Sequence, residues 1–171
     1  GGIHRICGAS WNTNNDNLLC VVYLGRTGVD KAYIFEMSGF SGTILRGIGG
    51  YFPEHDYDPA SPPPDNLPIP WGMAYDADKD LVIVGANIGD LSAGPYPSYP
   101  QSANFDHSTV WRMIYDAGDD RYVIYDSLTF DMPISGIEWV DGNLVITCPD
   151  SRWWIYSGFS KTVLKSGYLR T

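Results

Sequence analysis

Aromatic and acidic residues gather in two Pro-rich stretches of this 171-residue chain. Tyr rings stack on the apolar faces of sugars, and carboxylates accept hydrogen bonds from sugar hydroxyls. The same Tyr and Pro residues also suit packing of long loops against a fold or a neighbouring subunit. Both interpretations stay open at this point. The residues predicted to bind a ligand or partner are Tyr51, His55, Asp56, Tyr57, Asp58, Tyr96, Tyr99, Phe105, Asp106 and His107.

Two groups of acidic residues are candidates for binding a metal ion. The run from Glu54 to Asp58 can supply carboxylates to Ca²⁺ and an imidazole to a transition metal, but its spacing matches no defined motif. The acids from Asp76 to Asp80 alternate, yet they lack the Gly and the distal Glu of a calcium loop and predict a plain turn. We therefore predict no metal and no cofactor, with Ca²⁺ as the alternative.

Catalytic motifs are missing from the sequence. The chain has 3 His and contains no nucleophile elbow, zinc-binding helix or phosphate-binding Gly loop. A chain with 20 acidic residues contains many carboxylate pairs, so such pairs do not by themselves identify a glycan hydrolase. We assign no catalytic residue and predict a protein that is not an enzyme, with a glycan hydrolase as the alternative.

Composition excludes several partners. The formal net charge is -9, and no cluster of Lys or Arg offers attraction to phosphate. No apolar run approaches the roughly 20 residues that span a bilayer. The sequence thus predicts neither nucleic-acid binding nor membrane insertion. Its first residues lack signal-peptide features, which indicates a processed chain or a piece of a longer one. The 3 cysteines, Cys7, Cys20 and Cys148, lie in apolar runs and are predicted to be buried thiols.

The elements that would position these residues come from an internal repeat. Segments opening at Gly8, Gly72 and Gly136 begin 64 residues apart, each with an aromatic three positions later. The aromatics are Trp11, Tyr75 and Trp139, for which we predict packing between neighbouring repeat units. Short apolar runs and turn dipeptides such as Asp141-Gly142 divide each unit into four strands. The predicted strands are 6–11, 17–23, 31–36 and 43–47, then 72–75, 81–85, 109–115 and 121–128, then 136–140, 143–148, 152–156 and 162–169.

Tandem four-stranded antiparallel units are typical of β-propeller blades. The segments Gly136 to Thr147 and Ile155 to Val163 also resemble the propeller repeats of phage tail-associated and environmental proteins, which overlap NHL-like blades. The resemblance covers the third unit fully, the first well and the second in its front half. In the second unit, residues 117–120 replace the Gly-Phe-Ser turn.

We therefore predict an all-β, single domain, 1–171, of three blades. Blade 1 covers 5–50, an insertion covers 51–68, blade 2 covers 69–130 with a long loop at 86–108, and blade 3 covers 131–171. Closed propellers have about four to eight blades, so three blades predict half of a six-bladed ring completed by a second chain or by another segment of the same assembly. Both insertions should lie on one rim of the propeller, because loops after even-numbered strands share a face.

Function follows from this scaffold and from the resemblance. We expect a non-enzymatic structural or attachment protein, of a phage or viral particle, that contacts partner proteins through its long loops. The expected location is the virion or the extracellular space. The alternative is a lectin-like module that binds glycan on the decorated rim.

Overall fold

The computed structural model describes residues 3–25, 31–47, 69–89 and 105–169. All regular structure within these residues is β-strand, and none of them belongs to a helix that could cross a membrane. The predicted ligand-binding positions between 51 and 58 and between 96 and 99 lie outside the described residues.

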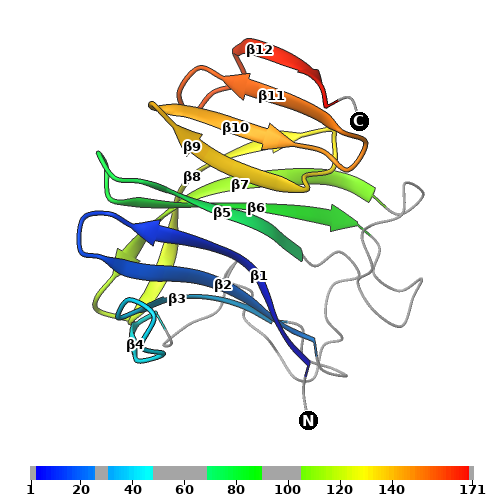
Figure 1. Ribbon diagram of the computed structural model, residues 1–171. Helices are drawn as coiled ribbons and strands as arrows, with labels where there is room; N and C mark the ends of the chain where they lie inside the picture. The colour runs from blue at the N-terminus through cyan, green and yellow to red at the C-terminus, as the bar shows by residue number, and fades with distance from the viewer. Residues whose placement is uncertain (1–2, 26–30, 48–68, 90–104, 170–171) are drawn as a thin grey trace.

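In the described part of the chain, twelve strands form three antiparallel sheets of four strands, each in sequence order (Figure 1). This confirms the predicted all-β class and the four-stranded units. Sheet 1 contains β1 (Ile3–Asn12), β2 (Asn17–Gly25), β3 (Lys31–Met37) and β4 (Ile44–Arg46). Sheet 2 contains β5 (Ile69–Asp76), β6 (Leu81–Gly89), β7 (Phe105–Asp116) and β8 (Arg121–Phe130). Sheet 3 contains β9 (Gly136–Val140), β10 (Asn143–Thr147), β11 (Arg152–Tyr156) and β12 (Val163–Tyr168).

Sheet 2 extends further than its sequence indicates. Strands β6 and β7 continue into the segment predicted as a loop from 86 to 108, where Asn87 pairs with Ser108 and Ile88 with His107. Asn side chains often compete with strand pairing by bonding backbone groups nearby in sequence. In the structure the Asn87 amide instead bonds both the carbonyl and the N–H of Ile134, 2.8 Å away in each case.

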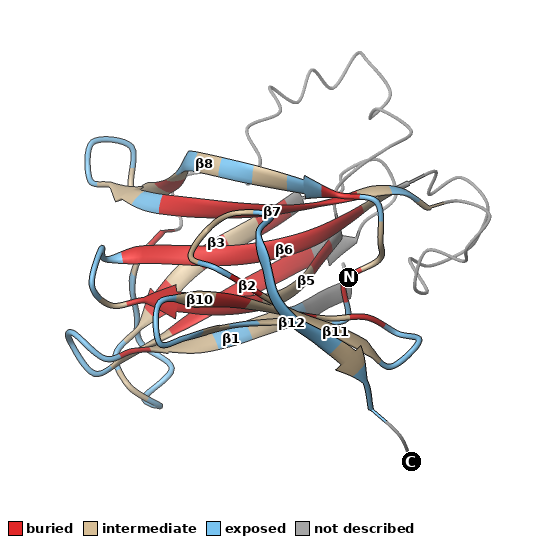
Figure 2. Ribbon diagram, turned by 90° about the horizontal axis from the view of Figure 1, so that it is seen from above, coloured by how far each residue is buried: buried red, intermediate tan, exposed pale blue. Residues whose placement is uncertain are grey.

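The sheets are stacked face to face, with sheet 2 between the others (Figure 1). One apolar cluster fills the space between sheets 1 and 2 and includes Leu19, Ile34, Val84 and Trp111. A second fills the space between sheets 2 and 3 and includes Ile83, Phe130 and Leu144. Because sheet 2 is covered on both faces, residues 81–87 of β6 are all buried, as Figure 2 shows.

Glycines bring the first strands of the three sheets into backbone contact. A Cβ atom added to Gly8 would lie 2.9 Å from the carbonyl carbon of Gly72, and one added to Gly72 would lie 2.9 Å from the backbone N of Ile137. Stacked sheets normally lie about 10 Å apart because side chains separate them. The sheets therefore approach most closely at β1, β5 and β9, and the 64-residue spacing of the glycines in the sequence marks this contact.

The repeat includes a backbone irregularity. Each sheet has a β-bulge between its third and fourth strands, directly after Glu36, Arg112 and Ile155. The extra residues are Leu45, Tyr125 and Leu164, which are 52%, 60% and 58% exposed. Bulges twist an edge strand and hinder its pairing with another sheet edge.

The predicted hairpin turns at 13–16, 77–80 and 141–142 are confirmed. Asp16, Asp80 and Asp120 end three turns of the same length in the left-handed conformation, with φ of 56°, 54° and 50°. Asp tolerates this conformation better than most residues. The residue directly before two of these turns accepts, through its side-chain oxygen, a hydrogen bond from the N–H two positions later, at 3.0 Å for Asn12 and 2.8 Å for Asp116.

Candidate functional site

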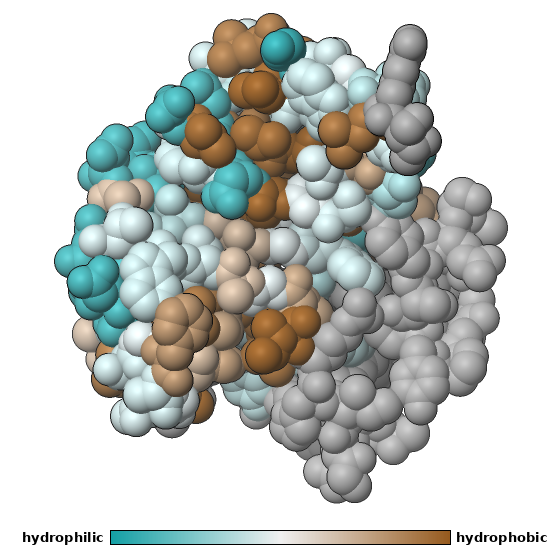
Figure 3. Space-filling view, viewed as in Figure 1, coloured by the Kyte–Doolittle hydropathy of each residue, from teal (hydrophilic) through white to brown (hydrophobic). Residues whose placement is uncertain are grey.

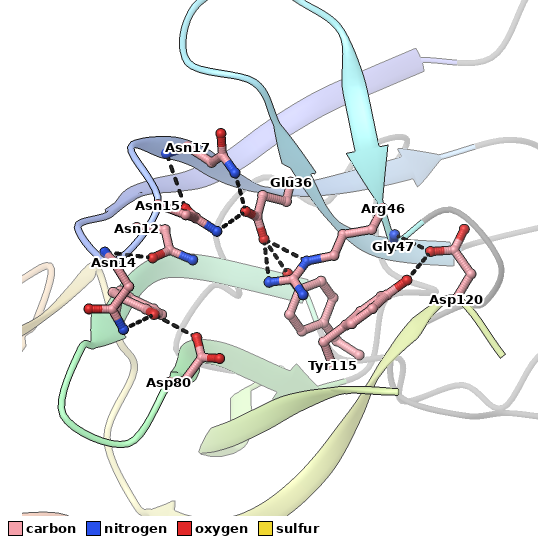
Figure 4. Close-up of polar contacts among 12 residues, drawn as sticks. Asn12, Asn14, Asn15, Asn17, Glu36, Arg46, Gly47, Asp80, Tyr115 and Asp120 are labelled. Atoms are coloured by element: carbon pink, nitrogen blue, oxygen red, sulfur yellow. Dashed lines mark hydrogen bonds and ion pairs between the residues drawn. The ribbon is translucent and has the colours of Figure 1, made fainter. Parts of the chain in front are cut away.

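Glu36 is the most buried acid among the described residues, with 1% of its surface exposed. It lies on β3 and faces sheet 2. Its Oε1 accepts hydrogen bonds from the side-chain amides of Asn15 at 2.7 Å and Asn17 at 2.6 Å (Figure 4). The β1–β2 turn and the first residue of β2 thus each supply one donor to a carboxylate on β3.

The second oxygen of Glu36 binds Arg46. Oε2 lies 2.7 Å from Nε and 2.6 Å from Nη2 of this guanidinium, and the Tyr122 hydroxyl adds a contact at 3.2 Å. Burial alone would raise the pKa of Glu36. The hydrogen bonds from Asn17, Arg46 and Asn15 and the charge of Arg46 outweigh burial and lower that pKa below its ordinary value. Glu36 is therefore a carboxylate at neutral pH.

Arg46 joins sheet 1 to sheet 2. Its Cζ lies 4.3 Å from the ring centroid of Tyr115, a cation–π contact. The Tyr115 hydroxyl donates to Asp120 at 2.7 Å, and the same carboxylate oxygen accepts the N–H of Gly47 at 2.8 Å. Asp120 thereby holds the end of β4 against the β7–β8 turn.

A second polar contact between these sheets centres on Tyr75. Its hydroxyl donates to Asp80 at 2.6 Å and accepts from the Asn14 side chain at 2.9 Å. Asn14 also donates to the carbonyl of Ala77 at 2.9 Å. Burial first, and then Asp80, raise the pKa of Tyr75 well above its ordinary value, so the hydroxyl stays protonated. We call the residues Asn14, Asn15, Asn17, Glu36, Arg46, Tyr75, Asp80, Tyr115, Asp120 and Tyr122 the polar seam.

The hydrogen-bonding partners that Glu36 already has limit the chemistry available to the polar seam. Both oxygens of Glu36 already accept hydrogen bonds from Asn or Arg donors, so neither is positioned to take a proton from a substrate. A buried carboxylate with a complete set of partners fixes one arrangement of its surroundings. The polar seam connects sheets 1 and 2 through the contacts of Arg46, Asp120 and Tyr75.

Sheets 2 and 3 are joined by a related contact. Arg112 lies on β7 and binds Asp126 of β8 through Nε at 2.7 Å and through Nη2. Its Cζ lies 4.4 Å from the ring of Phe159, which follows β11 in sheet 3. Here too an ion pair on one sheet presents a guanidinium to an aromatic ring of the next.

Three predicted rim residues fall within the described part of the chain. Phe105, Asp106 and His107 open β7, and His107 Nδ1 lies 2.8 Å from Asp106 Oδ2. The side chain of Asp106 is 67% exposed and that of His107 is 32% exposed. Tyr51, His55, Asp56, Tyr57, Asp58, Tyr96 and Tyr99 lie outside the described residues, as does the alternative Ca²⁺ site.

The three equivalent aromatics take different surroundings. Tyr75 belongs to the apolar cluster between sheets 1 and 2, and Trp139 packs against the cluster between sheets 2 and 3. Trp11 lies on the face of sheet 1 that points away from sheet 2. It stacks on Phe40 with ring centroids 5.2 Å apart.

The thiols and acids offer no further chemistry in the described residues. Cys20 and Cys148 are buried, as predicted, and burial raises the pKa of Cys148 to about 11. Cys7 is only partly buried. Within the described ranges no three His, Cys, Asp or Glu side chains lie close enough to hold a metal ion.

Glu36 and Arg46 were not singled out from the sequence. The available signal was a Glu that alternates with Ile34 and Ala32 on the apolar face of a predicted strand. Such a residue needs a buried partner. The partners come from a turn and from the next strand, 10 to 21 positions away, and sequence pattern alone does not identify them.

Comparison with known proteins does not identify a family for this chain. No protein-family model matches the chain, and no curated protein shows significant similarity to it.

Proposed function

We propose that the chain contributes three consecutive blades of a β-propeller and serves as a non-enzymatic assembly and attachment module. The proposal rests on one row of side chains that recurs in each sheet. The row runs across the first three strands and consists of an aromatic, an aliphatic and a large apolar residue. Its members are Trp11, Leu18 and Met37 in sheet 1, Tyr75, Val82 and Met113 in sheet 2, and Trp139, Leu144 and Tyr156 in sheet 3.

In two of the sheets this row is covered by the preceding sheet. The row of sheet 2 lies in the cluster shared with sheet 1, and the row of sheet 3 lies in the cluster shared with sheet 2. The row of sheet 1 has no sheet across it among the described residues. Trp11, Leu18 and Met37 remain partly exposed, although they match residues that are buried elsewhere. An uncovered face of this kind marks an association site.

The shape of the stack supports a propeller. The first strands touch through Gly8 and Gly72, while large side chains such as Trp111 and Phe130 separate the later strands. Units that are narrow at the first strand and wide at the fourth form sectors of a ring. A ring of about six sectors would need sheets beyond the three in this chain.

Exposed apolar side chains at both ends of the stack favour association with other chains over a monomeric state. In Figure 3 such residues gather at the top, over sheet 3, and near the bottom, over sheet 1. The exposed examples include Phe40 at 85%, Ile6 at 65%, Leu164 at 58% and Val140 at 47%. Together with the resemblance of the repeats to phage tail-associated propellers, this favours a component of a virion or extracellular particle that contacts other proteins.

The mass of the native protein tests the proposal. We expect light scattering to give a species heavier than the 19.0 kDa monomer at about 50 μM, a concentration at which weak protein interfaces form. A protein that stays monomeric at that concentration, and that binds no dye specific for exposed apolar surface, would contradict an assembly role. Turnover of labelled polysaccharides would contradict the non-enzymatic part.

A further inference from the structure

Each sheet carries a cation in the equivalent cross-strand pair of its third and fourth strands, on the fourth strand in sheets 1 and 3 and on the third strand in sheet 2. The cross-strand pair directly before the shared bulge is Glu36–Arg46 in sheet 1, Arg112–Asp126 in sheet 2 and Ile155–Lys165 in sheet 3. One member of every pair is an Arg or a Lys. These positions lie on the face that each sheet turns toward the sheet that follows it in the chain.

In both interfaces between sheets the cation contacts an aromatic ring of the next sheet. Arg46 lies 4.3 Å from the ring centroid of Tyr115, and Arg112 lies 4.4 Å from that of Phe159. Both rings lie at the hairpin between the third and fourth strands of their sheet. The contact is thus a repeated feature, with the cation supplied by one sheet and the ring supplied by its successor.

The cation half of this contact is unmatched at the end of sheet 3. Lys165 lies on the fourth strand of sheet 3, at the position of Arg46, whereas Arg112 is the third-strand member of the equivalent pair in sheet 2. No described sheet follows Lys165. Its Nζ lies 5.9 Å from the ring of Trp153 on its own sheet. Val145, Trp153 and Ile155 surround it on a face that no other described residues cover as a sheet.

The ring half is unmatched at the start of sheet 1. Phe40 and Phe159 occupy the same turn, in which a Ser hydroxyl donates to the carbonyl three residues back, at 2.7 Å for Ser41 and 2.6 Å for Ser160. Phe159 packs against the second apolar cluster, whereas Phe40 is 85% exposed. Phe40 therefore has the position of a ring that receives a cation from a preceding sheet.

We propose that a second copy of this chain supplies both missing halves, with sheet 3 of one copy packed on sheet 1 of the other. Lys165 of each copy then lies over Phe40 of its partner, and the row of Trp11, Leu18 and Met37 meets Val145 and Ile155. The proposed contact specifies both the partner and the surface used in assembly, and it rests on the assembly function proposed above.

Two identical head-to-tail contacts close the assembly. A sheet order of 1-2-3-1-2-3 gives a ring of six sheets with two-fold symmetry, a size typical of propellers. In one copy Phe40 and Lys165 lie on sheets at opposite ends of the stack, so they can meet only between copies (Figure 1). This separation makes the contact testable by exchanging charges.

The experiment measures dimer dissociation constants of the full chain by sedimentation velocity. Phe40→Lys would place a cation against Lys165, and Lys165→Glu would remove the cation, so each should weaken the dimer about tenfold or more. The double variant F40K/K165E would pair an ammonium with a carboxylate across the interface. We expect its dissociation constant to return to within about threefold of the original.

Two matched controls carry the same changes away from the interface. Lys79→Glu alters the exposed β5–β6 turn, and Ile124→Lys alters the outer strand of sheet 2; neither should affect dimerisation. Circular dichroism checks that each variant is folded, and Phe40→Ala with Lys165→Ala gives a milder pair if a charged variant unfolds.

The outcomes separate this inference from the assembly role. An assembly that ignores Phe40→Lys, that lacks rescue in the double variant, or that grows into open filaments would overturn the head-to-tail pair and leave the assembly role standing. A chain that stays monomeric at about 50 μM would overturn both.

Discussion

Glu36 shows how one buried charge determines the arrangement of its neighbours. Its carboxylate accepts hydrogen bonds from two Asn side chains of one turn and from an Arg that also lies against an aromatic ring of the next sheet. Removing one partner of a buried ion pair leaves the other without compensation. The stability of the interface between sheets 1 and 2 should therefore depend on the ionisation of this residue.

Replacing Glu36 with Gln should lower the free energy of unfolding by about 3 kcal/mol at pH 7. The pKa of Glu36 is lower in the folded protein than in the unfolded chain, so its contribution is complete above about pH 4.5. The contribution is lost as the pH falls through the folded pKa. Urea unfolding at pH 7, 5, 4 and 3 should show the difference between the two proteins shrinking with acid.

Asp131→Asn provides the matched control, because Asp131 is an exposed acid at the surface. It should change the free energy of unfolding by no more than about 0.5 kcal/mol at pH 7. A constant difference between the original protein and Glu36→Gln across the whole pH range would show that the charge of Glu36 does not contribute to the interface.

Gly72 combines a positive φ with close backbone contact to sheet 3. Its φ is +102°, and a Cβ atom there would lie 2.9 Å from the backbone N of Ile137. Gly72→Ala should lower the free energy of unfolding by about 3 kcal/mol or more, because both the backbone strain and the clash with sheet 3 oppose it. Thermal denaturation followed by circular dichroism measures the loss.

Gly42→Ala separates the two causes. Gly42 has a φ of +77° but nothing within 4 Å of an added Cβ, so only the backbone strain applies. We expect a loss of about 1 kcal/mol. Equal losses for the two substitutions would argue against close contact between β5 and β9.

At the scale of elements, one turn design serves three hairpins. A polar residue begins the turn, and an Asp in the left-handed conformation ends it four residues later. In two of the hairpins this last Asp also accepts the hydroxyl of the Tyr that precedes the turn, Tyr75 to Asp80 and Tyr115 to Asp120. The turn therefore closes locally and also reaches the neighbouring sheet.

Asp120 tests the longer-range part of this design. Asp120→Asn keeps an acceptor oxygen and tolerance of a positive φ, so it should cost less than about 1 kcal/mol. Asp120→Ala loses the bonds from Gly47 and Tyr115 as well as the favourable φ, and should cost about 3 kcal/mol. Guanidinium unfolding curves would measure both values.

Asp16→Ala isolates the backbone cost, because Asp16 has a φ of 56° but its side chain makes no hydrogen bond with another described residue. About 1 kcal/mol is expected. If Asp120→Ala costs no more than Asp16→Ala, the contact between β4 and the β7–β8 turn contributes nothing.

For the whole molecule, unmatched faces at both ends link stability to concentration. A ligand or partner that binds only the folded state raises the melting temperature by mass action. If a second copy covers these faces, Tm should rise by roughly 5 °C when the protein concentration increases a hundredfold. Differential scanning calorimetry at several concentrations would show the trend.

The Phe40→Lys variant serves as the comparison, because its weakened self-association should remove most of the concentration dependence. An original protein whose Tm is the same at every concentration would instead behave as a self-sufficient monomer, contrary to the assembly role.

The chain's own order of residues determined its strands and turns, because these depend on neighbours a few positions apart. Asp141-Gly142 favours a hairpin turn through its tolerance of positive φ, here 50° and 73°, and apolar alternation marks each strand. The equal spacing of Gly8, Gly72 and Gly136 also indicated the internal repeat. Sequence pattern did not locate the ends of β6 and β7, because Asn87 and Ser108 pair across the two ends of the segment predicted as a loop from 86 to 108.

Tertiary structure alone decided which face of each strand is covered and which polar residues meet. Leu18 and Leu19 are adjacent in sequence, yet one faces sheet 2 and the other faces away from it. The partnership of Glu36 with Tyr122 joins positions 86 residues apart. Phe40 is 85% exposed, whereas Phe159 packs against the preceding sheet, and no sheet among the described residues precedes Phe40. Such contacts arise from the stacking of whole sheets, a property that no short stretch of sequence carries.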